Sequence, residues 1–207
     1  MKYPITQDLS RTQVRQIIRQ KRQSLTRHEQ NSAGLELLEQ IKHLSIIDNA
    51  KNIAIYLSSD GEVDTQPIIE WLWKQKKRVL LPVLHPFSQG HLLFLEYCAT
   101  SPICHNKYRI IEPKLDQTQI CPVSCIDIIF TPLVAFDHNG QRLGMGGGYY
   151  DRTLEKWFNT GKGAIPIGLA HQCQQVEHLP SEHWDIPLPI IVTPKQIWHW
   201  EKNEKSL

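Results

Sequence analysis

Residues 125–152 read CIDIIFTPLVAFDHNGQRLGMGGGYYDR. The runs CIDIIFTP and LVAFD are almost continuously apolar, as is typical of strands that are covered on both faces. Four glycines then fall within residues 144–148, and a helix is predicted from about Tyr149 to Phe158. A buried strand, a glycine-rich turn and a helix in this order indicate an α/β fold. The turn is expected beyond the carboxyl end of a strand, where ligands bind in such folds.

The rest of the chain alternates between the same two kinds of element. Helices are predicted over residues 10–25, where Ser10 and Gln13 form a capping box, and over 27–44 and 64–77. Strands are predicted over 51–57, 78–84 (interrupted by Pro82), 91–97, 164–170 and 189–194, with 197–200 as a candidate edge strand. This alternation predicts a single domain, residues 1–207, in which helices cover both faces of a sheet.

The composition is that of an ordinary soluble protein. The 207 residues are 41% hydrophobic and 21% charged, with a formal net charge of +2, which gives no general reason to expect nucleic acid or an acidic membrane as a partner. No apolar run approaches the ~20 residues that cross a bilayer, and the N-terminus lacks the pattern of a secretory signal. The five cysteines include no C-x-x-C pair. We expect a cytoplasmic monomer with reduced thiols and no nucleic-acid or membrane partner.

The glycine cluster suits anion binding, because free backbone N–H groups and the positive end of a helix dipole meet there. Its glycines are Gly144, Gly146, Gly147 and Gly148. It matches neither standard phosphate motif, since no Lys-Ser/Thr pair follows and Tyr149 stands where a dinucleotide fingerprint needs its third glycine. The alternative is a flexible strand-to-helix turn.

Four arginines, at positions 11, 15, 19 and 22, are spaced to share one face of the first predicted helix. The planar guanidinium group can bind two phosphate oxygens at once, so this stripe is a candidate phosphate contact. A solvated helix face with local carboxylate partners is the alternative.

Glu62 lies in the loop SSDGEVDT after a predicted strand. Its carboxylate could accept paired hydrogen bonds from the amino and ring N–H groups of a pterin. Alternatively, Asp60 and Gly61 form a turn and Glu62 caps the next helix.

Two aspartates are candidate magnesium ligands, because Mg²⁺ takes hard oxygen ligands. Asp151 opens a helix beside the glycines, whereas Asp185 is distant in sequence and nothing in the spacing joins the two. Asp151 could instead be an ordinary first-turn aspartate. Tyr149 and Tyr150 could stack on a flat ring or pack in the core, and helical periodicity points them in different directions.

The string LVAFDHNGQRLGMGGGYYDR resembles the signature segment of the 5-formyltetrahydrofolate cyclo-ligase family. RTQVRQIIRQKRQSLT, IAIYLSSDGEVDT and LPSEHWDIPLPIIVT are similar to other segments of that family. The resemblance implies a three-layer α/β/α fold with a Rossmann-like, mostly parallel sheet. It also implies an ATP- and Mg²⁺-dependent enzyme that closes 5-formyltetrahydrofolate to 5,10-methenyltetrahydrofolate and releases ADP and phosphate, through phosphorylation of the formyl oxygen.

The resemblance also assigns roles to residues of this chain. It implies catalytic roles for Arg15, Arg142, Tyr149 and Asp151, and Mg²⁺ ligation by Asp151 and Asp185. It implies ATP contacts for Arg11, Arg15, Arg142, Leu143, Gly144, Met145, Gly146, Gly147, Gly148, Tyr149 and Tyr150. It implies folate contacts for Leu57, Glu62, Met145, Gly146, Gly147, Gly148 and Tyr149. We therefore expect the arginine helix and the glycine cluster to converge on the same phosphate groups.

Two other functions are open at this point. A non-catalytic folate- or nucleotide-binding module of the same fold is the main alternative. An RNA-binding role for the arginine helix is poorly supported, because the helix lacks interleaved aromatic residues.

Overall fold

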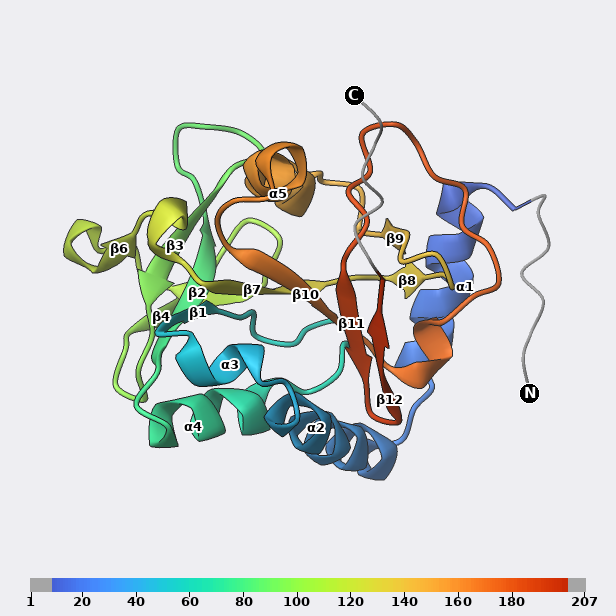
Figure 1. Cartoon of the computed structure of the whole chain (residues 1–207), viewed down its shortest axis with the longest axis horizontal. Helices are drawn as coiled ribbons and strands as arrows, with labels where there is room; N and C mark the ends of the chain where they lie inside the picture. Colours follow the sequence, from blue (N-terminus) through green and yellow to red (C-terminus); the bar gives the residue numbers. More distant parts are fainter. Residues whose placement is uncertain (1–8, 201–207) are drawn as a thin grey trace.

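The computed structural model describes residues 9–200, which form a central sheet with helices on both faces (Figure 1). The strand order is β12-β11-β10-β7-β1-β2-β3-β6. Neighbours from β11 to β2 run parallel, whereas β12, β3 and β6 are antiparallel additions at the edges. The bounds are β1 Asn52–Ala54, β2 Arg78–Leu84, β3 Leu92–Glu96, β6 Ile120–Cys121, β7 Ile128–Pro132, β10 Ile165–Leu169, β11 Ile190–Thr193 and β12 Gln196–His199. The predicted mostly parallel sheet is confirmed.

Helices form the outer layers. On one face lie α2 (Arg27–Lys42), α3 (Ile46–Asn49) and α4 (Gln66–Lys74), and on the other lies α5 (Tyr149–Thr160) (Figure 1). Helix α1 (Arg11–Gln23) stands at one end, against a small hairpin of β8 (Ala135–Phe136) and β9 (Arg142–Leu143). A second hairpin, β4 (Ile103–His105) and β5 (Ile111–Pro113), and short 3₁₀ turns at Gln117–Gln119, Val123–Cys125 and Gln172–Gln174 complete the described part.

The core follows from the alternation of side chains along the strands. Ile53 and Ile128 pack with the helices α2 to α4, whereas the next residues, Ala54 and Ile129, pack with Leu154 of α5. All five are essentially inaccessible to water. Because burying an aliphatic side chain contributes about 1.5–3 kcal/mol, the two faces together fix the order and register of the inner strands.

Two strand predictions need correction. Strand β2 runs through Pro82 without interruption. The ladder to β1 ends where the Ile55 N–H donates to the Leu80 carbonyl, because the next hydrogen bond would need the N–H that Pro82 lacks, whereas the pairing with β3 continues through Pro82. The run LVAFD does not join the central sheet either. After Asp137 the chain turns back at Gly140, whose N–H donates to the Asp137 carbonyl, so β8 pairs with β9 instead.

Helix α1 begins at the predicted capping box, in which Ser10 and Gln13 exchange hydrogen bonds. Its apolar residues Val14 and Ile18 are fully buried with Leu143 of β9. This packing holds the arginine-bearing face of the helix beside the segment that leads into the glycine cluster.

The other end of α1 is bound to the loop after β1 through Asp60. The Asp60 carboxylate accepts hydrogen bonds from Arg19 at 2.7 and 3.0 Å, from Arg22 at 2.6 Å and from Gln23. The Arg22 side chain is fully buried, and its Nε also donates to the Asp60 carbonyl at 2.8 Å. A solvated face with a carboxylate partner therefore describes the partly exposed Arg19, and it is wrong for Arg22, which is buried.

We expect Asp60→Asn to lower the free energy of unfolding by about 2 kcal/mol at neutral pH. The arginines hold the pKa of Asp60 at about 2, below its ordinary 3.8, and a difference of this size corresponds to about 2 kcal/mol. Because the folded-state pKa is depressed, this stabilisation is present above pH ~4 and is lost as the pH falls through ~2. Urea unfolding of both proteins between pH 2 and 7 measures the difference.

Asp48→Asn is the matched control, because Asp48 is exposed and its carboxylate forms no ion pair with a described residue. A gap between wild type and Asp60→Asn that stays constant with pH would contradict the role assigned to the ion pairs.

Candidate active site

The glycine loop, residues 144–148, connects β9 to α5. None of its five N–H groups donates a hydrogen bond to another residue in the range 9–200. Gly146 and Gly148 have φ values of 98° and 66°, which residues with a Cβ rarely adopt. The loop therefore presents free N–H groups at the positive end of the α5 dipole, an arrangement suited to an anion.

Arg15 of α1 contacts this loop, so the arginine helix and the glycine cluster lie together, and their shared contact with phosphate stays a prediction. Its Nε donates to the Gly144 carbonyl at 2.8 Å, and a Cβ built on Gly146 would lie 3.5 Å from its Nη2. The two Nη groups have no acceptor among residues 9–200. Burial and the neighbouring charge of Arg11 lower the pKa of Arg15. The negative charge of an anion bound at the loop would act against both effects and raise the pKa of Arg15 again.

The two predicted metal ligands lie close together, although they are distant in sequence. Asp185 forms a bidentate ion pair with Arg11, which also donates to the Pro180 carbonyl. Asp151 pairs with Arg142 at 2.5 Å, and it lies 3.4 Å from the backbone N–H of Ile186, next to Asp185. Asp151 does lie in the first turn of α5, and its carboxylate also contacts Arg142 and the segment that carries Asp185. Both carboxylates are engaged by arginines that the resemblance assigns to ATP.

Arg142 is almost fully buried, and its Nε has no hydrogen-bond partner among the described residues. Burial lowers the pKa of this arginine, while the charges of Asp151 and Asp185 oppose the change. Its neighbour Leu143 packs its side chain in the apolar cluster under α1. Met145, in contrast, is 54% exposed at the top of the glycine loop.

A second group of polar residues lies where the loop after β1 meets α5. Asp60 and Gly61 form the predicted turn, and the Glu62 carboxylate accepts from the Ser59 N–H at 3.1 Å. Glu62 does not cap α4, whose N-cap is Thr65, so that alternative is wrong. Leu57, three residues beyond the carboxyl end of β1, is half-buried in this loop.

The Glu62 carboxyl is surrounded by protein, although the residue as a whole is half-buried. Burial raises its pKa to about 7, against the opposing charge of Arg22. The buried hydroxyl of Tyr56 faces the same region and lacks a partner among the described residues. Burial and then the charge of Glu62 raise the pKa of Tyr150, which also feels the charge of Arg142. Tyr150 therefore joins the Glu62 region to the Arg142 region.

Tyr149 points elsewhere, as helical periodicity predicts. Its hydroxyl lies 3.2 Å from that of Tyr108, in the turn between β4 and β5, and the Arg152 guanidinium lies 5.9 Å from its ring centre. No signal in the sequence pointed to Tyr108, and Arg152 stood out only as a charged flank of the glycine cluster. Nothing in the hairpin sequence indicates that it reaches the glycine loop, whereas the position of Arg152 directly after Asp151 was a usable signal.

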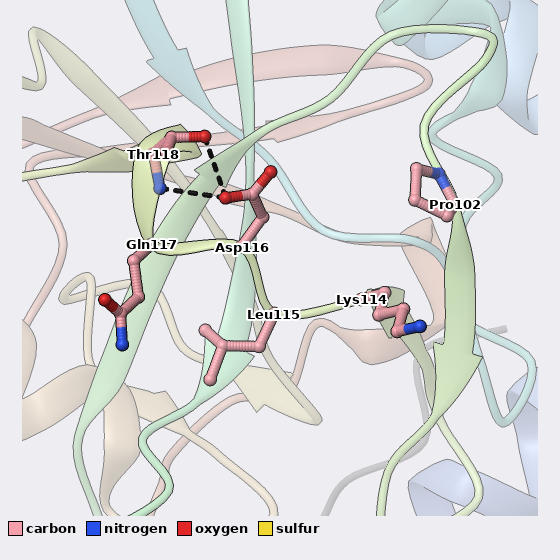
Figure 2. A pocket seen from close by; sticks show the side chains of 6 residues that line it. All are labelled: Pro102, Lys114, Leu115, Asp116, Gln117 and Thr118. Carbon is pink, nitrogen blue, oxygen red and sulfur yellow. Dashed lines mark hydrogen bonds between the residues drawn. The ribbon is translucent and has the colours of Figure 1, made fainter.

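A surface hollow elsewhere on the molecule is not part of this site (Figure 2). Its lining residues are Pro102, Lys114, Leu115, Asp116, Gln117 and Thr118. The only carboxylate there, Asp116, accepts from the N–H and hydroxyl of Thr118 at 2.9 and 2.7 Å. This hollow contains none of the residues predicted for ATP, folate or metal. Within residues 9–200, no helix has the length and apolarity to cross a membrane.

The fold and the site define a class, an α/β protein whose glycine loop is arranged to bind an anion at the carboxyl edge of a mostly parallel sheet. The sequence model of the 5-formyltetrahydrofolate cyclo-ligase family matches residues 7–194. The chain is 52% identical to the 5-formyltetrahydrofolate cyclo-ligase of Escherichia coli K12 over 89% of its length and 100% of the relative. It is 52% identical to the Haemophilus influenzae protein of the same name, over 86% of the chain and 94% of the relative. The chain therefore belongs to the 5-formyltetrahydrofolate cyclo-ligase family, a family of enzymes.

Solved structures agree. The 5,10-methenyltetrahydrofolate synthetase of Aquifex aeolicus superposes with a TM-score of 0.78 at 28% identity, covering 96% of each chain. The 5,10-methenyltetrahydrofolate synthetase of Mycoplasma pneumoniae has a TM-score of 0.70 at 24% identity, covering 90% of this chain and 99% of its own. The second structure supports the fold alone.

We expect Glu62→Gln to be more stable than wild type above pH 7, by up to about 3 kcal/mol. The folded-state pKa of about 7 lies above the ordinary 4.5, so ionisation destabilises the folded state. The stability of the wild type is complete below pH ~4.5 and falls as the pH rises towards ~7. The variant lacks this loss. Urea unfolding from pH 4 to 8 should show two curves that coincide in acid and separate towards neutral pH, and parallel curves would contradict the burial of this carboxyl.

Proposed function

We propose that this protein converts 5-formyltetrahydrofolate to 5,10-methenyltetrahydrofolate with consumption of ATP. The observation that carries the proposal is the glycine loop, whose five N–H groups donate to no residue in the described part of the chain. Arg15 lies against this loop, and its two Nη groups have no acceptor there either. In the reaction, the γ-phosphoryl group moves to the formyl oxygen and ADP leaves. The folate nitrogen N10 then attacks the activated carbon and loses its proton, and the carbon–oxygen bond to phosphate breaks.

Phosphoryl transfer needs positioning and charge neutralisation more than covalent chemistry. The N–H groups of the glycine loop can donate to phosphate oxygens, and the α5 dipole favours negative charge at the same place. The two Nη groups of Arg15, which have no acceptor among the described residues, can donate to the same phosphate oxygens. Arg142 adds a charge that is held under the loop by its pair with Asp151.

Asp151 and Asp185 fit the chemistry of a magnesium site. No cluster of three or more His, Cys, Asp or Glu residues suited to a metal occurs within residues 9–200. Two carboxylates are nevertheless a common protein contribution to a Mg²⁺ site, where phosphate and water supply the remaining ligands. When bound, Mg²⁺ would neutralise charge on the phosphate oxygens. Arg11 and Arg142, which now pair with these carboxylates, are then available to phosphate.

The pterin ring is assigned to the region of Glu62, Leu57 and Tyr150. An ionised carboxylate can accept several hydrogen bonds, and the Glu62 carboxyl accepts one from the backbone N–H of Ser59. The amino and ring N–H groups of a pterin would supply the missing donors and so favour the ionised form. Because Tyr150 adjoins both Glu62 and Arg142, this placement puts folate next to the phosphate site. We also propose that the protein acts in the cytoplasm, as a monomer.

The direct test mixes the purified protein with 5-formyltetrahydrofolate, ATP and Mg²⁺ and follows the absorbance of the methenyl product. ADP release is measured in parallel and should match product one to one. A folded protein that binds ATP and folate without turnover would be a binding module instead.

Arg15→Ala should raise KM for ATP by about tenfold or more, because a charge-assisted hydrogen bond of this kind contributes about 1.5–3 kcal/mol. Steady-state kinetics at saturating folate measure the change. Arg27→Ala is the control, since Arg27 is exposed in the first turn of α2 and should leave KM unchanged. The same KM in both variants would remove Arg15 from the nucleotide site.

Asp151→Asn should reduce kcat by about 100-fold, because the amide is a much weaker ligand for Mg²⁺ than the carboxylate. The substitution also leaves the buried Arg142 without its ion pair, so a thermal melt must accompany the kinetics. Glu155→Gln, one turn further along α5 and exposed, is the control. An unchanged dependence of rate on Mg²⁺ concentration would exclude Asp151 as a ligand.

A further inference from the structure

Arg152, in the first turn of α5, touches three different groups around the glycine loop. Its Nε donates to the Gly90 carbonyl at 2.7 Å, and its Nη2 donates to the Gly147 carbonyl. Its Cζ lies 5.9 Å from the centre of the Tyr149 ring. Gly90 belongs to the turn between β2 and β3, so one side chain connects that turn to the glycine loop.

The space around the guanidinium is shaped by two glycines on these two segments. A Cβ built on Gly90 would lie 2.2 Å from Nη2, and one built on Gly148 would lie 2.8 Å from Nη1. Both distances are far inside van der Waals contact, so a side chain at either position would displace the guanidinium. Arg152 thus occupies a fitted position, although it is an exposed residue.

The bond to Gly147 fixes the direction of a peptide group. In a planar trans peptide, the C=O of one residue and the N–H of the next point to opposite sides. Arg152 binds the Gly147 carbonyl, so the N–H of Gly148 points away from it. Arg15 does the same at the start of the loop, where its bond to the Gly144 carbonyl directs the N–H of Met145 away.

We propose that Arg152 is a positioning residue: it orients the Gly147–Gly148 peptide for binding ATP phosphates and anchors that orientation on Gly90. This inference rests on the proposed function. It assigns the arginine no contact with substrate, so loss of the side chain should weaken nucleotide binding more than it slows the bound complex.

The test compares Arg152→Ala, Arg152→Lys and the control Lys156→Ala with wild type. Lys156 is exposed one turn further along the same helix, so its removal changes the charge without touching the glycine loop. Arg152→Ala should raise both Kd and KM for ATP by about tenfold and leave kcat within about twofold of wild type. Arg152→Lys should recover little, because an ammonium group cannot bridge two carbonyls in a fixed fork. Added guanidinium ion should partly restore ATP binding to Arg152→Ala.

Two further measurements separate positioning from direct contact. Backbone order parameters from NMR on the nucleotide-free protein should fall at Gly147, Gly148 and Gly90 in Arg152→Ala, and at none of these in Lys156→Ala. Gly90→Ala should also weaken ATP binding, and its effect should be strongly non-additive with that of Arg152→Ala.

Unchanged Kd and order parameters in Arg152→Ala would overturn the inference, as would additive effects in the double variant. A fall in kcat with unchanged Kd would overturn it too. ATP binding and product formation by the wild type are measured separately, because they test the proposed reaction itself. A wild type that binds ATP but makes no methenyl product would overturn the proposed reaction alone, and a wild type that binds no ATP would overturn both.

Discussion

The ion pair between Asp60 and the buried Arg22 is the constraint on which the site depends. It fixes the loop that carries Glu62 to the second half of α1. Arg15 precedes Arg22 by two helical turns, about 10 Å along the axis, and it contacts the glycine loop. A single rigid helix therefore sets the distance between the proposed phosphate site and the proposed pterin site. Neither loop could keep its place by its own contacts, since one is rich in glycine and the other turns at two residues with positive φ.

Two ion pairs lie beside the glycine loop, and a gain in folding stability is a poor explanation for their presence. Arg142 is almost fully buried with Asp151, and Arg11 is paired with a nearly buried Asp185. Removing two charges from water costs several kcal/mol, and such a pair is often no more stable than apolar residues of the same size. Function gives the better reason for them. In the proposed function, the carboxylates of Asp151 and Asp185 and the guanidinium groups of Arg11, Arg15 and Arg142 would exchange partners with a phosphate chain and a metal ion. The site would then stay near neutral before and after binding.

Much of the fold was predictable from the sequence, because the signals are local. The apolar runs, the capping box of α1 and the glycine cluster before α5 each mark an element within a few residues. The convergence of Arg15 on the glycine loop also follows, once both are interpreted as phosphate contacts. The proximity of Asp151 to Asp185 was implied by the resemblance alone, and neither the partner of Asp60 nor the approach of Tyr108 to Tyr149 was predicted. Each joins segments that are 34 or more residues apart, and no local pattern encodes which loop folds over which. The β8–β9 hairpin was missed for another reason, since its Asp-x-x-Gly turn was present but the apolar run was taken for a strand of the sheet.

The glycines of the loop are there for different reasons, and the difference separates folding from binding. Gly146 and Gly148 need their positive φ, and a Cβ on Gly147 would lie 2.7 Å from the Tyr149 ring. These three serve the conformation of the loop itself. Gly144 has no such requirement, because its φ is not positive and a Cβ there would meet only the end of the Arg142 side chain, at 3.8 Å. The described structure leaves that position open, so the conformation of the loop gives no reason for a glycine there. Bare backbone at Gly144, beside Arg15 and Arg142, would allow the proposed phosphate groups to bind close to the chain.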